Sequence, residues 1–355
     1  MVNIVILAGG GGERLWPKSR KNKPKQCISL DRGVSLIQQT YHNACKIVDS
    51  KKIHISTRDS LKQLIREQLP DVNLIVEPLG RDSAAGIGYA CSHLLNDDQN
   101  DVTIFMGADY FIPDLTKFKL AINPAVKLAE QNKIALIGIK PRRAETRFGY
   151  IEPGNRLTAT TENTFEVNSF KEKPTSSTAR EYIRLGYLWN SGMFIVKPSF
   201  LYLSYKKFMP TLYEGLETIR KENFDPQVAK KVFEPLSKVS IDYGIMEKSS
   251  DLVVVKGDFE WDDIGTWDSL DRIMDRDNEG NIIQSDFLGV DVKNSIIFGE
   301  KPIVGLGIED LVIIDTNDCI FVCKKGRAHE IKKIITKLEE HPTMNKLLNY
   351  NDFSS

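Results

Sequence analysis

The stretch Leu7-Ala8-Gly9-Gly10-Gly11-Gly12-Glu13-Arg14-Leu15-Trp16-Pro17 follows directly on the apolar run Val2 to Ile6. This run predicts a buried strand, so the glycines form a loop at the strand's carboxyl end. Because glycine has no Cβ, the backbone N–H groups of such a loop can close on an anion, and Arg14 adds positive charge there. Lys25 follows soon after. Since open α/β sheets bind ligands at the carboxyl ends of their strands, the stretch predicts a phosphate-binding loop.

Two common phosphate loops are excluded. The stretch lacks the Gly-Lys-Ser/Thr ending of a P-loop, and Arg14 stands where a dinucleotide fingerprint beginning at Gly9 would need its third glycine. A flexible surface turn is the usual interpretation of a glycine run alone. It is the weaker interpretation here because the loop follows a predicted strand.

Length and composition limit the functional classes. The 355 residues suffice for one large α/β domain and a small one. Lys plus Arg and Asp plus Glu both total 48, which argues against nucleic acid or an anionic membrane as the main partner. The five cysteines show no disulfide framework spacing, and the N-terminal apolar run is too short for a secretory signal. We therefore expect a cytoplasmic protein.

The first part of the chain alternates apolar runs with segments of helical spacing. This rhythm predicts a mainly parallel sheet covered by helices on both faces. Pro124 is expected to kink or restart the last helix. The expected strands are Val2–Ile6, Lys52–Ser56, Asn73–Glu77, Val102–Met106 and Ile134–Ile139, and the expected helices are Ser35–Val48, Leu61–Leu69, Ser83–Leu95 and Phe118–Gln131.

The rhythm changes after Ile139, where short strand-like pieces dominate and a second substrate is expected to bind. A domain boundary near Gly280 gives a large domain at 1–280 and a β-rich module with a terminal helix at 281–355. The expected strands are Tyr150–Glu152, Phe165–Lys171, Met193–Val196, Leu252–Val255, Ile282–Ile283, Ser295–Phe298, Leu311–Ile314 and Cys319–Val322. The expected helices are Thr178–Leu185, Pro198–Phe208, Trp267 to about Arg276, and Ile331–Glu340.

Two carboxylates are candidate ligands of a hard cation. Asp109 follows the strand Val102–Met106, and Asp263 lies between Trp261 and Trp267. Mg²⁺ is commonly held by such carboxylates together with substrate phosphates. Asp262 is adjacent, so spacing alone does not choose between it and Asp263. For Asp109 alone, a turn or helix cap is the favoured interpretation.

Polar segments elsewhere carry groups that suit ligand binding, although ordinary caps and turns have the same residues. Glu77 to Ser83 ends a predicted strand and begins a helix, and either Ser83 or Asp82 is expected to be its N-cap. The same segment is suited to line a base or ribose pocket. Glu172-Lys173-Pro174 and Asn190-Ser191-Gly192 carry the amides, carboxylates and cations that a sugar site needs, although ordinary turns share this composition.

Taken in order, these segments resemble the mannose-1-phosphate guanylyltransferases. The two tryptophans of the Trp261 segment and Trp16 help to separate this branch from other sugar nucleotidyltransferases. The matching segments are Leu7–Pro17, Ser19-Arg20, Pro24–Gln26, Glu77-Pro78 with Gly80-Arg81, Asp109, Phe148–Glu152, Glu172–Pro174, Trp189–Phe194, Ser240–Tyr243, Trp261–Trp267 and Gly307–Leu311.

The resemblance implies a Rossmann-like nucleotidyltransferase domain, with a mainly parallel mixed sheet, that binds GTP and mannose 1-phosphate and makes GDP-mannose. It implies catalytic roles for Arg14 and Lys25, and Mg²⁺ ligation by Asp109 and Asp263. The implied nucleotide contacts are Leu7, Ala8, Gly9, Gly10, Glu77, Pro78, Gly80 and Arg81, and the implied sugar contacts are Gly149, Glu172, Lys173, Asn190 and Asp242. The β module of short members often takes part in dimerisation, so the resemblance is compatible with a homodimer.

Some positions depart from the family pattern. Glu13 stands where threonine is usual and Tyr110 where histidine is usual, while Asp82 to Ala85 replace a common Asn-Thr-Ala-Pro. These departures bear on nucleotide affinity and base preference. Two alternatives stay open: a nucleotidyltransferase for another hexose 1-phosphate, and a catalytically silent homologue that regulates a partner.

Overall fold

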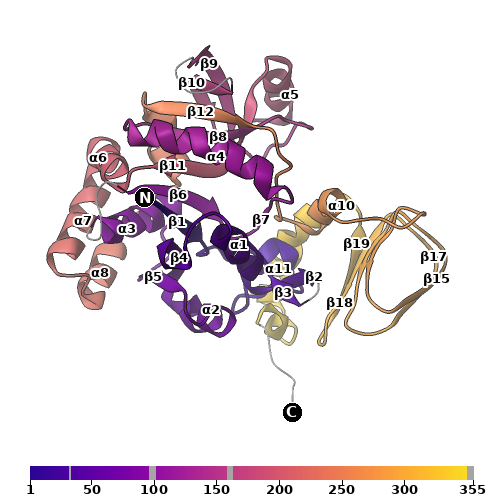
Figure 1. The fold of residues 1–355 in the computed structure, drawn as a ribbon. Helices are drawn as coiled ribbons and strands as arrows, with labels where there is room; N and C mark the ends of the chain where they lie inside the picture. Colours follow the sequence, from indigo (N-terminus) through magenta and orange to yellow (C-terminus); the bar gives the residue numbers. More distant parts are fainter. Residues whose placement is uncertain (32, 96–100, 158–162, 350–355) are drawn as a thin grey trace. The chain divides into compact units, whose positions relative to one another are not determined.

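A computed structural model describes residues 1–31, 33–95, 101–157 and 163–349 of the chain (Figure 1). The chain divides into two compact units. Unit 1 comprises Met1–Gly9, Tyr41–Ala108 and Ile112–Trp261, and unit 2 comprises Gly10–Thr40, Asp109–Phe111 and Asp262–Ser355. The catalytic and β-rich domains expected on either side of Gly280 stay a prediction.

The described part of unit 1 is built on a nine-stranded mixed sheet in the order β5-β4-β1-β6-β11-β8-β12-β10-β9. Neighbours from β5 to β6 run parallel, as does the pair β8 and β12, while β11 is antiparallel to both of its neighbours in that order. The strands are β1 (Val2–Leu7), β4 (Ile53–Arg58), β5 (Asn73–Glu77), β6 (Val102–Gly107), β8 (Ile134–Ile139), β9 (Tyr150–Arg156), β10 (Thr164–Lys171), β11 (Leu188–Val196) and β12 (Leu252–Gly257). The expected α/β architecture with a mixed sheet is confirmed, but the sheet is not mainly parallel, because β9, β10 and β11 pair in antiparallel fashion.

Helices cover the sheet and supply much of the core of unit 1. Helices α3, α6, α7 and α8 pack against one another, and the fully buried Tyr205 donates a hydrogen bond from its hydroxyl to the carbonyl of Ala84 at 2.7 Å. Helix α4 packs on β8, β11 and β12, and Asp114 caps it by accepting from the N–H of Lys117. The helices are α2 (Lys62–Gln68), α3 (Asp82–Leu94), α4 (Leu115–Glu130), α5 (Ser176–Arg184), α6 (Pro198–Phe208), α7 (Pro210–Lys221), α8 (Pro226–Phe233) and α9 (Ile241–Gly244), and α1 (Leu36–Cys45) spans the passage between units at Thr40.

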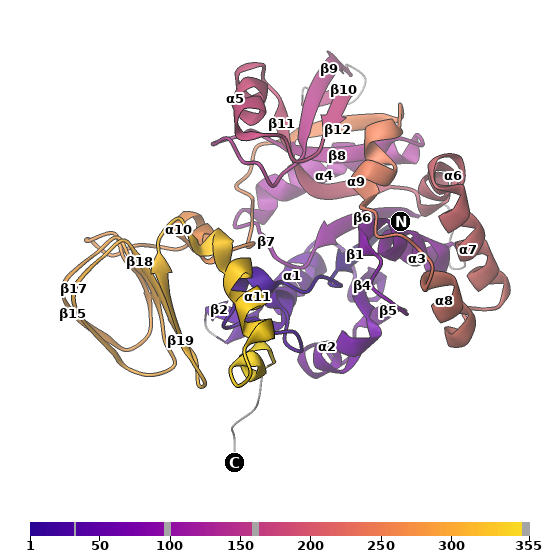
Figure 2. The ribbon, with the colours of Figure 1, turned by 180° about the vertical axis from the view of Figure 1, so that it is seen from behind.

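Strands β14 to β18 of unit 2 wind as a parallel coil, side by side in both ribbon views (Figure 2). Strands β14, β16 and β18 pair in parallel, as do β15 and β17, and β19 closes one edge in antiparallel fashion. The elements are β2 (Ser29–Asp31), β3 (Val34–Ser35), β7 (Tyr110–Phe111), β13 (Asp262–Asp263), α10 (Leu270–Ile273), β14 (Ile282–Gln284), β15 (Phe287–Lys293), β16 (Ile296–Phe298), β17 (Ile303–Glu309), β18 (Leu311–Asp315), β19 (Ile320–Lys324) and α11 (Lys332–Glu340).

Two tryptophans join distant segments in the core of unit 2. Trp267 is fully buried, its indole N–H donates to the carbonyl of Trp16 at 2.9 Å, and its ring lies 5.3 Å from that of Phe298. The indole of Trp16 donates in turn to the carbonyl of Leu347 at 3.0 Å. These contacts link the glycine loop segment, the β coil and the terminal segment.

Several expectations need correction. Pro124 lies inside α4 and does not divide it, and the helix after Trp267 ends at Ile273, well before Arg276. Helix α3 has Arg81 as its N-cap, without a side-chain cap. Asp82 is its first residue with a φ of 68°, and the Ser83 hydroxyl accepts a hydrogen bond from the N–H of Ile241.

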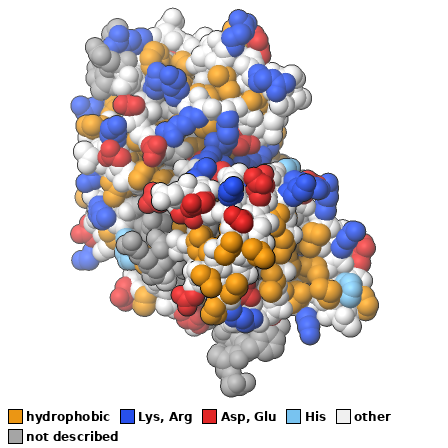
Figure 3. Space-filling view, turned by 90° about the vertical axis from the view of Figure 1, so that its right-hand side faces the viewer, with side chains coloured by type: hydrophobic (Ala, Val, Ile, Leu, Met, Phe, Trp, Pro, Cys, Tyr) orange, Lys and Arg blue, Asp and Glu red, His pale blue; other side chains and the backbone are white. Residues whose placement is uncertain are grey.

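Helices α7 and α8 and strands β15 and β17 were not expected from the sequence. Gly289, Gly305 and Gly307 interrupt the strand pattern, and the outward side chains of this pair are apolar, so strict alternation is lost. Leu288, Val290, Val304 and Leu306 are all more than half exposed, and Figure 3 shows hydrophobic side chains gathered over this face of the module.

Among the described helices, none combines the length and apolar character needed to cross a bilayer.

The Trp267→Leu variant is expected to lose about 3 kcal/mol of unfolding free energy, because the ring contact with Phe298 and the hydrogen bond to Trp16 disappear and a cavity remains. Denaturant unfolding of the two proteins measures the difference. Leu203→Ala, which shortens a side chain that is 61% exposed, is the control expected to stay within about 0.5 kcal/mol of the parent. Equal losses in the two variants would contradict the account.

Candidate functional site

The parallel strands of unit 1 end at one edge of the sheet. Arg58 on β4 pairs with Glu77 on β5, and Leu7 on β1 pairs with Ser56 and with Gly107 on β6. Hydrogen bonds hold the strand exits together, since the N–H of Ala8 donates to Ser56 at 2.8 Å and the N–H of Ala108 donates to Leu7 at 3.2 Å. The glycine loop and Asp109 therefore follow directly on neighbouring strand ends.

A buried carboxylate lies at this edge in a cradle of glycines. Glu77 is only 6% exposed, and its Oε2 has no hydrogen-bond partner among the residues that the structure describes. A Cβ on Gly9 would lie 2.8 Å from Oε1 of Glu77, and one on Gly86 would lie 3.0 Å from Oε2. Burial raises the pKa of Glu77 to about 7, although the nearby charge of Arg58 opposes the rise. The cradle thus holds an acceptor that the described side chains leave unsatisfied.

The rest of the Glu77 to Arg81 segment lies close to β4 and α8. A Cβ on Gly80 would lie 3.0 Å from Cδ of Arg58, so the backbone passes close to that side chain. Arg81 donates to the carbonyl of Phe233 at 2.8 Å and to that of Glu234 at 2.5 Å. These bonds satisfy carbonyls at the C-terminal end of α8. The implied nucleotide contacts of Pro78, Gly80 and Arg81 stay predictions.

The glycine loop of unit 2 is packed against Lys25. Gly12 has a φ of 62°, and a Cβ there would overlap with the Lys25 side chain and lie 2.7 Å from the Lys25 backbone nitrogen, so only glycine fits. The carbonyl of Gly10 accepts from the amide of Gln26 at 3.0 Å. Arg14 follows in a short 3₁₀ turn (Glu13–Leu15) and is half-buried, whereas Glu13 is exposed.

Lys25, Asp109 and Asp263 come together within unit 2. The Lys25 ammonium forms an ion pair with Oδ2 of Asp109. Strand β7 begins just after Asp109 and pairs with β13, which places Asp263 opposite Tyr110, and the N–H of Ile264 donates to the carbonyl of Asp109 at 3.1 Å. The structure thus gathers two predicted metal ligands and one predicted catalytic cation.

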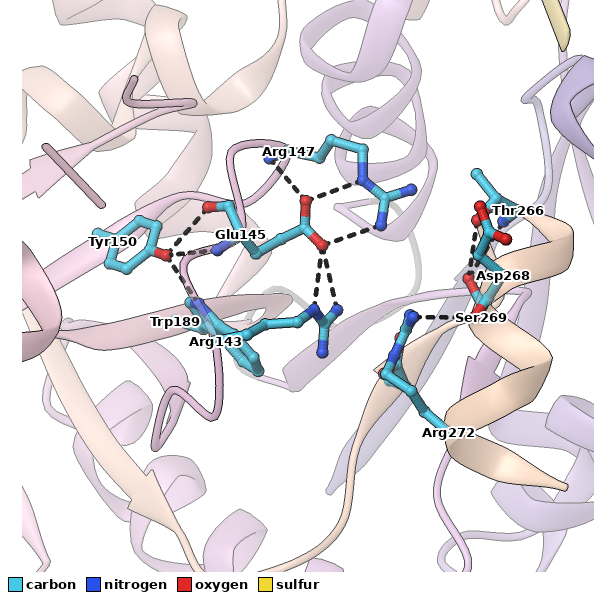
Figure 4. Close-up of polar contacts among 10 residues, drawn as sticks. Arg143, Glu145, Arg147, Tyr150, Trp189, Thr266, Asp268, Ser269 and Arg272 are labelled. Atoms are coloured by element: carbon cyan, nitrogen blue, oxygen red, sulfur yellow. Dashed lines mark hydrogen bonds and ion pairs between the residues drawn. The ribbon is translucent and has the colours of Figure 1, made fainter. Parts of the chain in front are cut away.

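Asp262 has a different environment from Asp263. Its two carboxylate oxygens accept from Arg272, Nε to Oδ2 at 2.5 Å and Nη2 to Oδ1 at 2.7 Å, and the residue is only 7% exposed. Figure 4 shows Arg272 donating also to the carbonyl of Asp268. Asp263 is the next residue of β13, and successive side chains of a strand face opposite sides.

The described residues contain no group of three or more His, Cys, Asp or Glu side chains arranged to hold a metal ion. The pair Asp109 and Asp263 suits a different arrangement. Mg²⁺ in nucleotide enzymes is commonly bound by one or two carboxylates and completed by substrate phosphates. The donor set fits an ion that arrives with its substrate.

The five predicted sugar contacts are brought together in unit 1. A Cβ on Gly149 would lie 2.6 Å from Oε2 of Glu172, and the carbonyl of Gly149 accepts from the N–H of Asn190 at 2.8 Å. The Asn190 amide donates to Oδ1 of Asp242 at 3.3 Å, and the Lys173 ammonium pairs with Glu172 at 2.8 Å. Burial first, and then the charge of Glu172, raise the pKa of Asp242 to about 7. The group offers hydrogen-bonding partners for hydroxyls.

Sequence reasoning missed Arg58 and Gly86, which both border the Glu77 carboxylate. Gly86 lies inside α3, where a glycine costs stability unless close packing requires it. That position was the available signal. Arg58 carried none, because an arginine at a strand end is common.

Two family models match the chain. One described as nucleotidyl transferase covers residues 3–280, and one described as MannoseP isomerase/GMP-like beta-helix domain covers residues 285–338. Mannose-1-phosphate guanylyltransferase 2 of Escherichia coli O157:H7 is 35% identical over 352 residues, which cover 94% of this chain and 73% of that protein. The mannose-1-phosphate guanylyltransferase of Salmonella muenchen is 35% identical over 348 residues, with coverages of 94% and 73%.

A solved structure is similar to most of the chain. A crystal structure from Thermus thermophilus, described as mannose-1-phosphate geranyltransferase, is 30% identical to the chain with a TM-score of 0.88. It covers 95% of this chain and 99% of that one.

The Glu77→Gln variant is expected to be more stable than the parent above neutral pH. The folded pKa of about 7 exceeds the ordinary value of 4.5, so the folded chain retains a proton that the unfolded chain releases, and the parent loses stability as pH rises from 4.5 through 7. At pH 8 the variant is expected to gain at most about 3 kcal/mol of unfolding free energy, and at pH 4.5 the gain disappears. Denaturant unfolding at both pH values measures this difference, and a gain that is the same at both would contradict it.

Proposed function

Because the chain belongs to the nucleotidyl transferase family, we propose that it transfers GMP from GTP to mannose 1-phosphate and releases pyrophosphate, with GDP-mannose as the product. The observation that carries this proposal is the gathering of the predicted residues into groups with complementary chemistry. The Lys25, Asp109 and Asp263 group suits polyphosphate, and the Gly149 to Asp242 group suits a sugar.

The Glu77 cradle supports a preference for guanine. Guanine presents two neighbouring donors, the N1–H and the 2-amino group, and a carboxylate accepts from both. Adenine has no such pair. The chain runs from Leu7 at the end of β1 through Ala8 to Gly9 beside Glu77. Because Gly9 has no Cβ, the Glu77 carboxylate can lie close to the backbone there. The orphaned acceptor of Glu77 would be satisfied by the bound base.

Arg14, Lys25 and the backbone N–H groups from Gly10 onward are proposed to hold the triphosphate. A phosphate oxygen would replace Asp109 as a partner of the Lys25 ammonium, which then neutralises charge on the α-phosphate as the transition state forms. Asp109 and Asp263 would hold Mg²⁺, which supplies further neutralisation of the phosphate oxygens when bound.

The five predicted sugar contacts, from Gly149 to Asp242, are proposed to orient mannose 1-phosphate. Glu172, Asn190 and Asp242 would bind hydroxyl groups, Gly149 would allow the ring to approach the backbone, and Lys173 would contribute a cation. A phosphate oxygen of the sugar phosphate attacks the α-phosphorus of GTP. The bond from that phosphorus to the bridging oxygen breaks, and pyrophosphate leaves with its electrons, so no protein nucleophile is needed.

The chain's organisation is proposed to follow the sequence prediction: a catalytic domain at 1–280, a β module at 281–355, and a cytoplasmic location. A homodimer through the β module is also proposed. Its support is the exposed aliphatic face of Leu288, Val290, Val304 and Leu306, since large exposed apolar patches mark interaction surfaces.

Pyrophosphate release from GTP that depends on mannose 1-phosphate is the direct test. Lys25→Ala is expected to lower kcat by at least about 100-fold without changing the unfolding temperature by more than about 3 °C, because a charge that acts on the transition state is lost. Lys21→Ala is the control, since its ion pair with Glu339 is half exposed. A parent protein with no turnover on any nucleotide and sugar phosphate would disprove the proposal.

The adjacent aspartates provide a matched test of metal ligation. Asp263→Asn is expected to lower Mg²⁺-dependent kcat by about 100-fold at nearly unchanged stability. Asp262→Asn instead breaks the ion pair with Arg272 and is expected to lower the unfolding free energy by about 2 kcal/mol while leaving the Mg²⁺ dependence intact. Titration of activity with Mg²⁺ and denaturant unfolding separate the two effects. Full activity in Asp263→Asn would remove that residue as a ligand.

A further inference from the structure

One carboxylate organises the segment that connects β8 to β9. Glu145 has a side chain only 11% exposed, and its oxygens accept from five N–H groups of two arginines. The donors are Nε and Nη2 of Arg143 at 3.3 and 3.1 Å, Nε and Nη2 of Arg147 at 2.9 and 3.0 Å, and the backbone N–H of Arg147 at 3.2 Å. Figure 4 shows the carboxylate held from both sides by these guanidinium groups. These hydrogen bonds hold Arg143, Glu145 and Arg147 of the segment 143–150 together.

The backbone of Glu145 is tied to the sheet through a tyrosine hydroxyl. Tyr150 accepts from the N–H of Glu145 at 3.1 Å and donates to the carbonyl of the same residue at 3.0 Å. The indole N–H of Trp189 donates to the same hydroxyl at 3.1 Å, and the guanidinium of Arg143 lies 4.9 Å from the Trp189 ring (Figure 4). Since Trp189 belongs to β11, the segment is fixed to the strand that carries Asn190.

The same segment contains Gly149 of the sugar group. The carbonyl of Phe148 accepts from the N–H of Lys173 at 3.2 Å, and the carbonyl of Gly149 accepts from the N–H of Asn190 at 2.8 Å. Gly149 lies so close to Glu172 that a Cβ would stand 2.6 Å from Oε2. A shift of the segment would therefore displace Gly149 relative to Glu172, Lys173 and Asn190.

We propose that Glu145 is a positioning residue for mannose 1-phosphate, and that its two arginine partners and Tyr150 hold Gly149 against Glu172 and Asn190. This inference rests on the proposed function, because it takes those residues as the sugar contacts. Glu145 itself does not touch the substrate in this account. Its five donors already occupy the carboxylate, so it acts through the segment.

The proposal makes the effect selective for one substrate. A change in the position of the proposed sugar contacts changes the productive binding of mannose 1-phosphate. Neither Glu77 with its neighbouring glycines nor Lys25 has a contact with Glu145 that the structure describes. A residue that only stabilised the fold would shift both Michaelis constants or neither. The two constants therefore distinguish the roles.

The experiment compares Glu145→Gln, Tyr150→Phe and Glu260→Gln with the parent. Glu145→Gln keeps the shape but places an amide against two guanidinium groups, and it is expected to raise KM for mannose 1-phosphate about 10-fold while KM for GTP stays within about 2-fold. Tyr150→Phe removes the hydroxyl that ties Glu145 to Trp189 and is expected to give a smaller change of the same kind. Glu260→Gln is the control, since Glu260 pairs with Arg142 and both side chains are 62% exposed.

Each outcome has a definite meaning. Equal changes in the two KM values, or none in a folded Glu145→Gln protein, would overturn the positioning role. Should Glu145→Gln fail to fold, the same comparison in Tyr150→Phe decides the question. Absence of mannose 1-phosphate turnover in the parent would instead overturn the proposed function, while an active parent with wild-type-like variants would overturn only this inference.

Discussion

Two glycines pack closely against one buried carboxylate in unit 1, and this contact constrains the surrounding backbone. Glu77 is a buried residue at the end of β5. Gly9 after β1 lies close to its Oε1, and Gly86 in α3 lies close to its Oε2. A side chain larger than hydrogen at either glycine would force the carboxylate to move. Burial of an acceptor without a partner opposes folding, and this cost is the basis for proposing that a ligand satisfies Glu77.

A second constraint acts on the glycine loop in unit 2. The left-handed Gly12 lets the loop backbone lie on Lys25, and the ion pair to Asp109 keeps the ammonium in place before substrate arrives. The pairing of β7 with β13 then adds Asp263. This arrangement of one cation and two carboxylates is the basis for proposing a phosphate and Mg²⁺ site in unit 2.

The sequence predicted well where local chemistry decides the structure. Asn73–Glu77 and Ile134–Ile139 begin and end as expected because each is an apolar run between polar residues. It predicted less where distant contacts decide. Asp262 and Asp263 are neighbours, and the sequence does not show that Asp262 accepts two hydrogen bonds from Arg272. Arg81 is an implied nucleotide contact by resemblance, and its donors reach carbonyls about 150 residues away, which no local pattern predicts.

The residues that support the two proposed sites are also hard to predict from the sequence. The Glu145 cluster has no signature beyond charge, because arginines and glutamates two residues apart are common in loops. Its importance arises from the tyrosine and tryptophan that tie it to β11. Glu77, by contrast, is a buried carboxylate that is also proposed to bind the base.

The most direct measurement is the affinity of the parent and of Glu77→Gln for GTP and for ITP, whose base lacks only the 2-amino group, by calorimetric titration at pH 8. The parent is expected to bind GTP about 10-fold more tightly than ITP, because the carboxylate loses one donor with ITP, and the variant is expected to discriminate by no more than about 2-fold. Equal binding of GTP and ITP by the parent, or an undiminished preference in Glu77→Gln, would contradict it.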